Sequence, residues 1–263
     1  MRDNALRGVL DSGRVAVCGW VSADSPYVAE VLSHAGFDTV VVDVQHGMFD
    51  VDRAVTLLQA VSAGPATPMA RAPSLDPPVI GKLLDAGAYG IICPAVDTVE
   101  QAEAFVRAMR YPPTGERSYG PSRGLLYGGP DYSEHADRTV LAWAMIESAT
   151  SLAHLDRILA VPGLDGVYVG PNDLALSLGE RPGLLQPPPR TWDALAHIAA
   201  RAAAAGVHAG VFSLDAAVGA DLAALGYRLV TPGNDVGILR AAAAARIATV
   251  RGTTTTSDAP AGY

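Results

Sequence analysis

Two carboxylates in this chain each follow a short apolar segment. Glu147 ends the run at residues 141–147, and Asp173 closely follows the run at residues 166–170. The two acids are about one strand-helix unit apart, so a parallel α/β fold places both at the C-terminal ends of neighbouring strands, where such folds hold active sites. Two oxygen ligands with room for water suit a hard divalent cation such as Mg²⁺ or Mn²⁺. The spacing leaves a second interpretation equally open, in which both acids only cap the helices that follow.

Further polar residues lie at the ends of neighbouring segments. Asp43 and His46 end the second apolar run, Arg71 ends the third, and Asp85 ends the helix predicted after it. A guanidinium is a planar donor for a carboxylate, an imidazole moves protons near neutral pH, and a cation on the two acids could polarise a keto oxygen. The set fits proton abstraction or carbon–carbon cleavage next to a 2-keto acid. Each residue also has a structural interpretation: Arg71 in a surface ion pair, His46 in the framework and Asp85 at a helix terminus.

Apolar runs alternate with helical patterns along most of the chain. The strand-like runs are residues 15–20, 39–46, 67–71, 90–96, 141–147, 166–170, 208–212 and 228–232. Helices are predicted near residues 26–35, 51–63, 78–86, 98–109, 151–159, 191–205 and 235–250. Eight strand-helix units predict an α/β fold of the (β/α)8 TIM barrel type, as a single domain over residues 1–250.

An open doubly wound sheet is the alternative fold, but the glycine fingerprints of nucleotide-binding folds are absent from the sequence. One long segment, residues 111–139, is rich in Gly, Pro, Tyr and Arg, and we expect it to be functional or partly helical. The last residues, 251–263, are rich in Thr, Ser, Ala and Gly and are predicted to be a disordered tail.

The bulk properties narrow the function. A net charge of −8 argues against nucleic acid as a partner. The apolar runs are too short to cross a bilayer, and the first residues lack the apolar core of a signal peptide. Cys18 and Cys93 lie inside apolar runs and are expected to be buried free thiols, which fits a cytoplasmic protein.

An ordered set of short motifs in the chain resembles the pattern of a known family. The residues that carry the resemblance occur in order over roughly residues 5–250. They are Ser25-Pro26-Tyr27, Asp43-Val44-Gln45-His46-Gly47, Arg71, Lys82-Leu83-Leu84-Asp85-Ala86-Gly87, Arg110-Tyr111-Pro112-Pro113-x-Gly115-x-Arg117, Ile146-Glu147-Ser148 and residues 163–174. This set is similar to the HpcH/HpaI aldolases, the metal-dependent class II pyruvate aldolases.

The resemblance implies a role for each matching residue. Glu147 and Asp173 match the metal ligands of the family, for Mg²⁺, Mn²⁺ or Co²⁺. Arg71 matches the arginine that holds the pyruvate end of the substrate and steadies its enolate. His46 matches the catalytic histidine, and Asp85 matches its carboxylate partner, which would come from a neighbouring subunit.

The resemblance also covers positioning, assembly and one departure. Asp43 matches an acid that helps to position the histidine, and the backbone near Asn172 and Asp173 matches the group that receives the substrate carboxylate. A homohexamer built as a dimer of trimers, with a swapped C-terminal helix, is implied. Met145 departs from the pattern, because many family members have Gln there, and this puts the usual water network around the metal in doubt.

Two arginines of the long segment leave alternatives open. Arg117 and Arg123 could bind a second substrate carboxylate or a neighbouring subunit, and salt bridges at an interface are equally compatible with the sequence. We therefore predict a metal-dependent carbon–carbon lyase, an aldolase that acts on a 2-keto acid and releases or adds an aldehyde. The alternatives are an oxaloacetate decarboxylase or citrate-synthase-like condensing enzyme on the same site, and a catalytically silent ligand-binding barrel.

Overall fold

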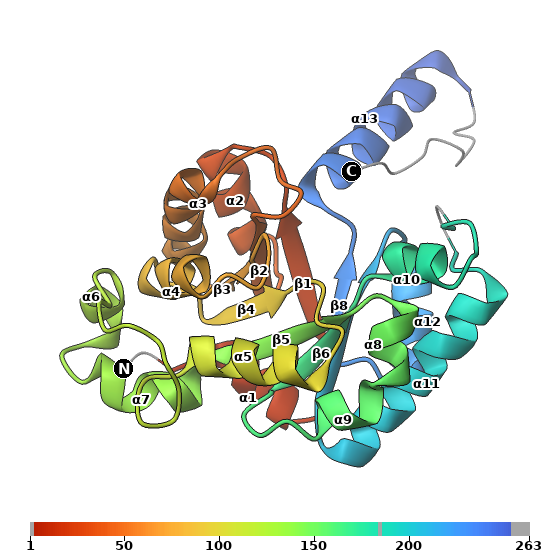
Figure 1. Ribbon diagram of the computed structural model, residues 1–263. Helices are drawn as coiled ribbons and strands as arrows, with labels where there is room; N and C mark the ends of the chain where they lie inside the picture. Colours follow the sequence, from red (N-terminus) through yellow and green to blue (C-terminus); the bar gives the residue numbers. More distant parts are fainter. Residues whose placement is uncertain (1–2, 184–185, 254–263) are drawn as a thin grey trace.

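A closed parallel barrel of eight strands forms the centre of the molecule (Figure 1). The computed structural model describes residues 3–183 and 186–253. The strands pair in chain order and β8 closes onto β1, so the predicted (β/α)8 barrel is confirmed. They are β1 Ala16–Val21, β2 Thr39–Asp43, β3 Thr67–Arg71, β4 Gly90–Cys93, β5 Leu141–Ile146, β6 Gly166–Val169, β7 His208–Ser213 and β8 Leu229–Pro232.

Helices connect the strands and cover the outside of the barrel. They are α1 Ala5–Asp11, α2 Pro26–His34, α3 Val51–Ala63, α4 Pro77–Asp85, α5 Val99–Met109, α6 Gly124–Gly128, α7 Tyr132–Thr139, α8 Ala149–Ala153, α9 Leu155–Leu159, α10 Pro171–Ser177, α11 Pro189–Ala205, α12 Ala216–Leu225 and α13 Asp235–Arg251. Several begin at sequence signals: Ser25 caps α2 with Pro26 at its first position, and Thr98 and Gln101 form a capping box on α5.

The structure adds detail that the helical patterns did not give. The long segment before β5 contains α6 and α7, in agreement with the expectation that it is partly helical. The single helix expected over residues 151–159 is instead two short helices, which meet at His154, a residue outside the helical region of φ and ψ whose ring contacts the carbonyl of Asp97. A short helix, α10, also begins directly after β6 at Pro171.

Two apolar layers build the core. One lies between the strands and the surrounding helices, and the other fills the barrel interior. The interior layer includes Trp20, Trp143, Met145 and Tyr168, and Leu6 of α1 packs against it. Because side chains of a strand alternate between the two faces, each strand contributes to both layers, which explains its nearly continuous apolar sequence.

Helix α13 leaves the barrel and extends away from the other helices (Figure 1). Its start is anchored, because Asp235 accepts hydrogen bonds from the backbone N–H groups of Ser22 and Ala23 at 3.0 Å. Farther along, apolar side chains are exposed, with Leu239 68% and Val250 88% accessible. Arg251 ends this helix, and residues 254–263 of the tail predicted to be disordered lie outside the described residues.

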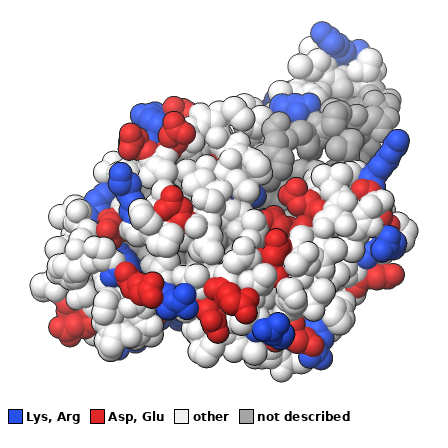
Figure 2. Space-filling model, viewed as in Figure 1, with Lys and Arg blue, Asp and Glu red and all other residues white. Residues whose placement is uncertain are grey.

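Across the described ranges, none of the helices is both long and apolar enough to cross a bilayer. Lys and Arg side chains are scattered among Asp and Glu on the face shown in Figure 2 and do not form one continuous patch there.

Candidate active site

The carboxyl ends of the strands surround a hollow of ≈ 340 Å³ at the mouth of the barrel. Its lining residues come from several strands and from the start of α10: Trp20, Arg71, Met145, Tyr168, Gly170, Pro171, Asn172, Asp173 and Phe212. This is the position at which (β/α)8 barrels hold their active sites. Three of the residues predicted from the sequence, Arg71, Asn172 and Asp173, therefore lie together.

Arg71 is held in place by Asp43. The two residues are in register on β3 and β2, so their side chains project to the same side of the sheet. Nε of Arg71 donates to Oδ1 of Asp43 at 2.8 Å and Nη2 donates to Oδ2 at 2.6 Å. Trp20 adds a third donor to this carboxylate at 3.1 Å, and its ring lies 5.0 Å from the guanidinium carbon. This bidentate geometry fixes the arginine more firmly than a surface ion pair would.

The environment of Asp43 keeps it ionised. Its side chain is fully buried, and burial by itself would raise the pKa of the carboxyl group. Hydrogen bonds and charge from Arg71, with further donors, outweigh burial and lower the pKa below the ordinary value. The same carboxylate accepts hydrogen bonds from the N–H groups of Gln45 and His46 at 3.1 and 3.2 Å. Asp43 therefore positions both Arg71 and the turn that carries the exposed His46.

Gly47 allows this turn to close tightly. Its N–H donates to the carbonyl oxygen of Asp43 at 3.0 Å. A Cβ at Gly47 would lie only 2.2 Å from that oxygen, so a larger residue would force the turn open. The Asp43–Gly47 segment is thus a compact support for the histidine.

Glu147 follows β5 and is half-buried beside the mouth. Its Oε1 accepts a hydrogen bond of 2.7 Å from the N–H of Ala95. Ala95 has φ 53° and is the one non-glycine residue with positive φ in the described part of the chain. Such a conformation is unfavourable for alanine, and strained backbone of this kind concentrates at functional sites.

The two predicted metal ligands, Glu147 and Asp173, interact electrostatically. Burial raises the pKa of Glu147, and the negative charge of Asp173 raises it further, while the Ala95 N–H and the charge of Arg71 oppose the shift. Two carboxylates close enough for one to raise the pKa of the other are the kind of oxygen donors that a hard divalent cation prefers. Within the described ranges, no group of three or more His, Cys, Asp or Glu residues is arranged to hold a metal. The residues present fit a cation held by two protein oxygens, with its other positions open to substrate and water.

Asp173 and Asn172 lie in the first turn of α10. Pro171 occupies the first position of this helix, and Gly170 precedes it. The first N–H groups of a helix have no acceptor within the helix, so they favour an anionic group in front of them. The start of α10 therefore suits the carboxylate of a 2-keto acid.

Gly170 lies close to the carboxylate of Glu147. A Cβ at this position would meet Oε2 of Glu147 at 3.1 Å and Cε of Met145 at 3.2 Å. Met145, only 1% exposed, faces the hollow from β5 with an apolar thioether. A thioether is a weak acceptor and does not orient water as an amide does.

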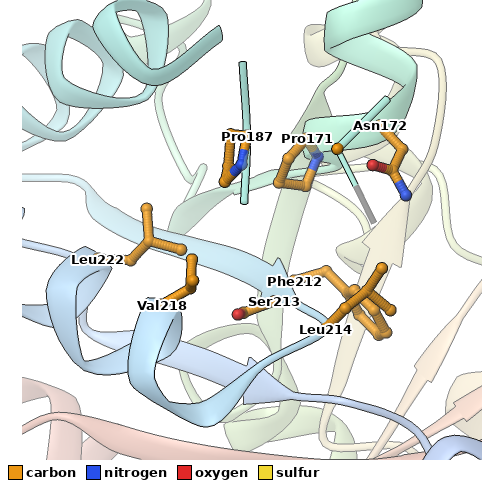
Figure 3. Close-up of a pocket in the computed structure, with 9 residues that line it drawn as sticks. Pro171, Asn172, Pro187, Phe212, Ser213, Leu214, Val218 and Leu222 are labelled. Atoms are coloured by element: carbon orange, nitrogen blue, oxygen red, sulfur yellow. The ribbon is translucent and has the colours of Figure 1, made fainter. Parts of the chain in front are cut away.

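A second hollow of ≈ 310 Å³ adjoins the first, since Pro171, Asn172 and Phe212 line both. In Figure 3, Pro171 and Pro187 lie on one side of it, and Val218 and Leu222 lie on the other. Its lining is mostly apolar. It lies beside the mouth, between the start of α10 and the residues of β7 and α12.

Asp85 and Arg123, which were also predicted as site residues, do not line the barrel mouth. Asp85 ends α4, five residues before β4 begins at Gly90, so it lies near the amino ends of the strands. Its partner within the chain is Arg117, at 2.6 Å. Arg123 lies beside it, donating its backbone N–H to the carbonyl of Asp85 and its side chain to the carbonyl of Ala86. One subunit therefore does not bring these residues to the mouth.

Sequence reasoning passed over several residues of the site. Trp20, Tyr168 and Phe212 line the mouth, and Trp20 supports both members of the Asp43–Arg71 pair. The position of Trp20 at the end of the first apolar run was an available signal, because it matches the strand-end placement of Arg71. The strained Ala95 had no signal in the sequence.

The closed barrel, with acids, an arginine and a histidine at or near its mouth, has the architecture of a barrel enzyme. Residues 17–242 match the HpcH/HpaI aldolase/citrate lyase family, and the chain belongs to this family.

Individual relatives agree with this assignment. The chain is 41% identical over 248 residues to a hydroxypyruvate/pyruvate aldolase from Rhizorhabdus wittichii, covering 94% of this chain and 99% of that protein. It is 34% identical over 241 residues to a 5-keto-4-deoxy-D-glucarate aldolase from Shigella dysenteriae, with 91% and 93% covered. The crystal structure of a family protein from Burkholderia cenocepacia has a TM-score of 0.88 at 31% identity, covering 95% of this chain and 100% of that one. The predicted family and enzyme class are confirmed: the protein is an aldolase of the HpcH/HpaI family.

Proposed function

We propose that this aldolase makes or cleaves a carbon–carbon bond next to a 2-keto acid of the pyruvate or hydroxypyruvate kind, through an enolate. The observation that carries the proposal is Arg71, which Asp43 fixes at the mouth within electrostatic reach of Glu147. An enolate requires positive charge where its oxygen develops, and prearranged charge stabilises it best. The relative named a hydroxypyruvate/pyruvate aldolase supports this substrate class.

The residues of the chain divide the work. The N–H groups of Asn172 and Asp173 receive the substrate carboxylate, and Arg71 faces the keto oxygen. In the cleavage direction, His46 takes the proton of the substrate hydroxyl, the carbon–carbon bond breaks, an aldehyde leaves, and the enolate regains a proton at carbon. A divalent cation held by Glu147 and Asp173, as Mg²⁺, Mn²⁺ or Co²⁺, would supply Lewis-acid stabilisation of the developing oxyanion.

Aldol addition tests this proposal. Pyruvate or hydroxypyruvate is incubated with a panel of aldehydes and Mg²⁺, and products are separated by chromatography. We expect a 4-hydroxy-2-keto acid in the wild-type reaction, none after chelation, and a loss of at least about 100-fold in His46→Ala, within the usual range for a general base. Chelation that leaves the rate unchanged would contradict the role of the cation.

We further propose that the enzyme works as a cytoplasmic homohexamer, a dimer of trimers, in which α13 packs on a neighbouring subunit. The exposed apolar side chains of α13 support this arrangement, because they have little to contact on their own barrel. The position of Asp85 also supports this arrangement. The residue lies away from the mouth of its own barrel, so its carboxylate can pair with His46 of a neighbouring subunit.

Subunit mixing tests the shared site. The variants His46→Ala and Asp85→Ala are each expected to be nearly inactive alone. After the two are unfolded together and refolded, some sites would combine an intact histidine from one subunit with an intact aspartate from the next. Recovery of activity supports the shared site, whereas a mixture as inactive as its components contradicts it.

A further inference from the structure

Arg117 is a buried cation outside the barrel mouth. Its side chain is only 1% exposed, in the segment between α5 and α6. The guanidinium carbon lies 4.5 Å from the centre of the Tyr111 ring and 5.6 Å from that of Tyr132. Two aromatic faces compensate part of the hydration that the guanidinium loses on burial.

One carboxylate neutralises this cation. Nη2 of Arg117 donates to Oδ1 of Asp85 at 2.6 Å and to the hydroxyl of Tyr132 at 3.3 Å. Nε and Nη1 are buried and find no hydrogen-bond acceptor among residues 3–183 and 186–253. A desolvated cation with a single anionic partner acts on that partner more strongly than a solvated one, since the local dielectric is low.

Asp85, the carboxylate that pairs with Arg117, is less enclosed than the arginine. The side chain of Asp85 is 24% exposed and borders a surface hollow of ≈ 770 Å³. The carboxylate is therefore held from inside by Arg117, while its outer side faces the space in which another molecule can approach.

We propose that Arg117 is a positioning residue of the aldolase reaction, which keeps the Asp85 carboxylate ionised and oriented toward the partner subunit's His46. This inference rests on the proposed function and the proposed subunit arrangement. Among the described residues, Arg117 contacts Asp85 and the rings of Tyr111 and Tyr132 in its own subunit. Arg117 does not touch the reacting atoms and acts only through Asp85.

The environment of Asp85 determines in which direction its pKa changes when Arg117 is removed. Burial raises the pKa of Asp85 above its ordinary value, and the hydrogen bond and charge of Arg117 offset only part of this rise. Removing the cation leaves burial uncompensated, so the pKa rises further and the carboxylate becomes protonated at a higher pH. Among the described residues, the titratable or charged groups near it include Asp52 of α3, Lys82 of α4, Arg123 before α6, and the two tyrosines that contact Arg117, Tyr111 and Tyr132.

The pH profile of kcat/KM tests the proposal with the full-length enzyme, Mg²⁺, and the most active pair of keto acid and aldehyde. We expect Arg117→Met to move the acid limb to higher pH, so that activity is lost on the acid side of the profile and approaches wild type on the alkaline side. A merely structural role would lower activity by a similar factor at every pH. Arg107→Met is the matched control, because Arg107 pairs with Glu116 on the same segment but is 45% exposed.

Coupling to Asp85 provides the second measurement. If Arg117 acts through this carboxylate, then Arg117→Met has little further effect in an Asp85→Asn background, and the two losses do not multiply. If Arg117→Met does not fold, as judged by thermal unfolding, Arg117→Lys is used in the same cycle.

The outcomes separate the proposals. An unshifted acid limb in Arg117→Met, or losses that multiply with Asp85→Asn, overturns this inference while an active wild type leaves the aldolase function standing. A wild-type enzyme that does not turn over 2-keto acids overturns both.

Discussion

Gly170 is the residue whose substitution most directly probes the two-carboxylate site. Its φ of −96° and ψ of 94° are open to any residue, so alanine adds no backbone strain. The added Cβ would lie 3.1 Å from Oε2 of Glu147, whereas ordinary contacts begin at 3.4 Å. The side chain of Met145 can bend away, but the carboxylate must shift by a few tenths of an ångström.

Such a shift exceeds what a metal site tolerates, since ligand distances hold within about 0.2 Å. We therefore expect Gly170→Ala to weaken Mn²⁺ binding about tenfold, which corresponds to roughly 1.4 kcal/mol. The assay is a Mn²⁺ titration, followed by the electron paramagnetic resonance signal of the free ion. Thermal unfolding in the presence of a chelator checks that the fold is intact.

Gly8→Ala is the matched control. Gly8 lies in α1, on the far side of the barrel from the mouth, and nothing lies within 4 Å of a Cβ built there. We expect wild-type Mn²⁺ affinity and a stability gain of about 0.5–1 kcal/mol, because alanine favours a helix. If Gly170→Ala binds Mn²⁺ as tightly as this control does, Glu147 is not a ligand in the geometry described here.

Three further substitutions test the charges at the mouth. Asp43→Asn leaves Arg71 buried without its carboxylate, and we expect it to lower the free energy of unfolding by about 3–5 kcal/mol in urea titrations at neutral pH. This loss should shrink in acid. The reason is that a carboxyl group with a lowered pKa contributes stability that disappears as the pH falls through its folded-state pKa. Arg71→Lys keeps the charge but loses the planar pair, so steady-state assays should show kcat reduced at least about tenfold; unchanged kcat would contradict the enolate role. Glu147→Gln removes a carboxyl group whose raised pKa costs folding stability as the pH rises from the unfolded-state pKa to the folded-state pKa. Without metal at neutral pH, the variant should therefore melt at a slightly higher temperature than wild type. Added Mn²⁺ should not raise its melting temperature further.

The sequence contained most of the information that defines the barrel. Continuous apolar runs between amphipathic helices are what a parallel sheet covered on both faces requires, and all eight strands lie within a few residues of their predicted positions. The same logic located Arg71, Glu147 and Asp173, because it needs only the position of a polar residue relative to the end of a strand. Short helices such as α6 and α10 were not predicted, because five to seven residues show too little hydrophobic periodicity.

Pairings across the fold were the part that no local pattern gives. Asp43 could be suspected of supporting His46, but its bidentate pair with Arg71 depends on the register of β2 and β3. The pair of Arg117 with Asp85 joins residues 32 positions apart, and Arg117 lies in the irregular segment between α5 and α6. Register and loop packing depend on the whole chain, so these contacts appear only in three dimensions.

Proton exchange at the methyl group of pyruvate reports on enolate formation by itself, because it does not depend on the choice of aldehyde. Pyruvate is incubated in deuterium oxide with the enzyme and Mg²⁺, and the methyl signal is followed by proton NMR. We expect exchange that requires the cation, stops on chelation, and falls sharply in Arg71→Lys. No exchange with Mg²⁺, Mn²⁺ or Co²⁺, or exchange indifferent to chelation, would contradict the proposed enolate mechanism.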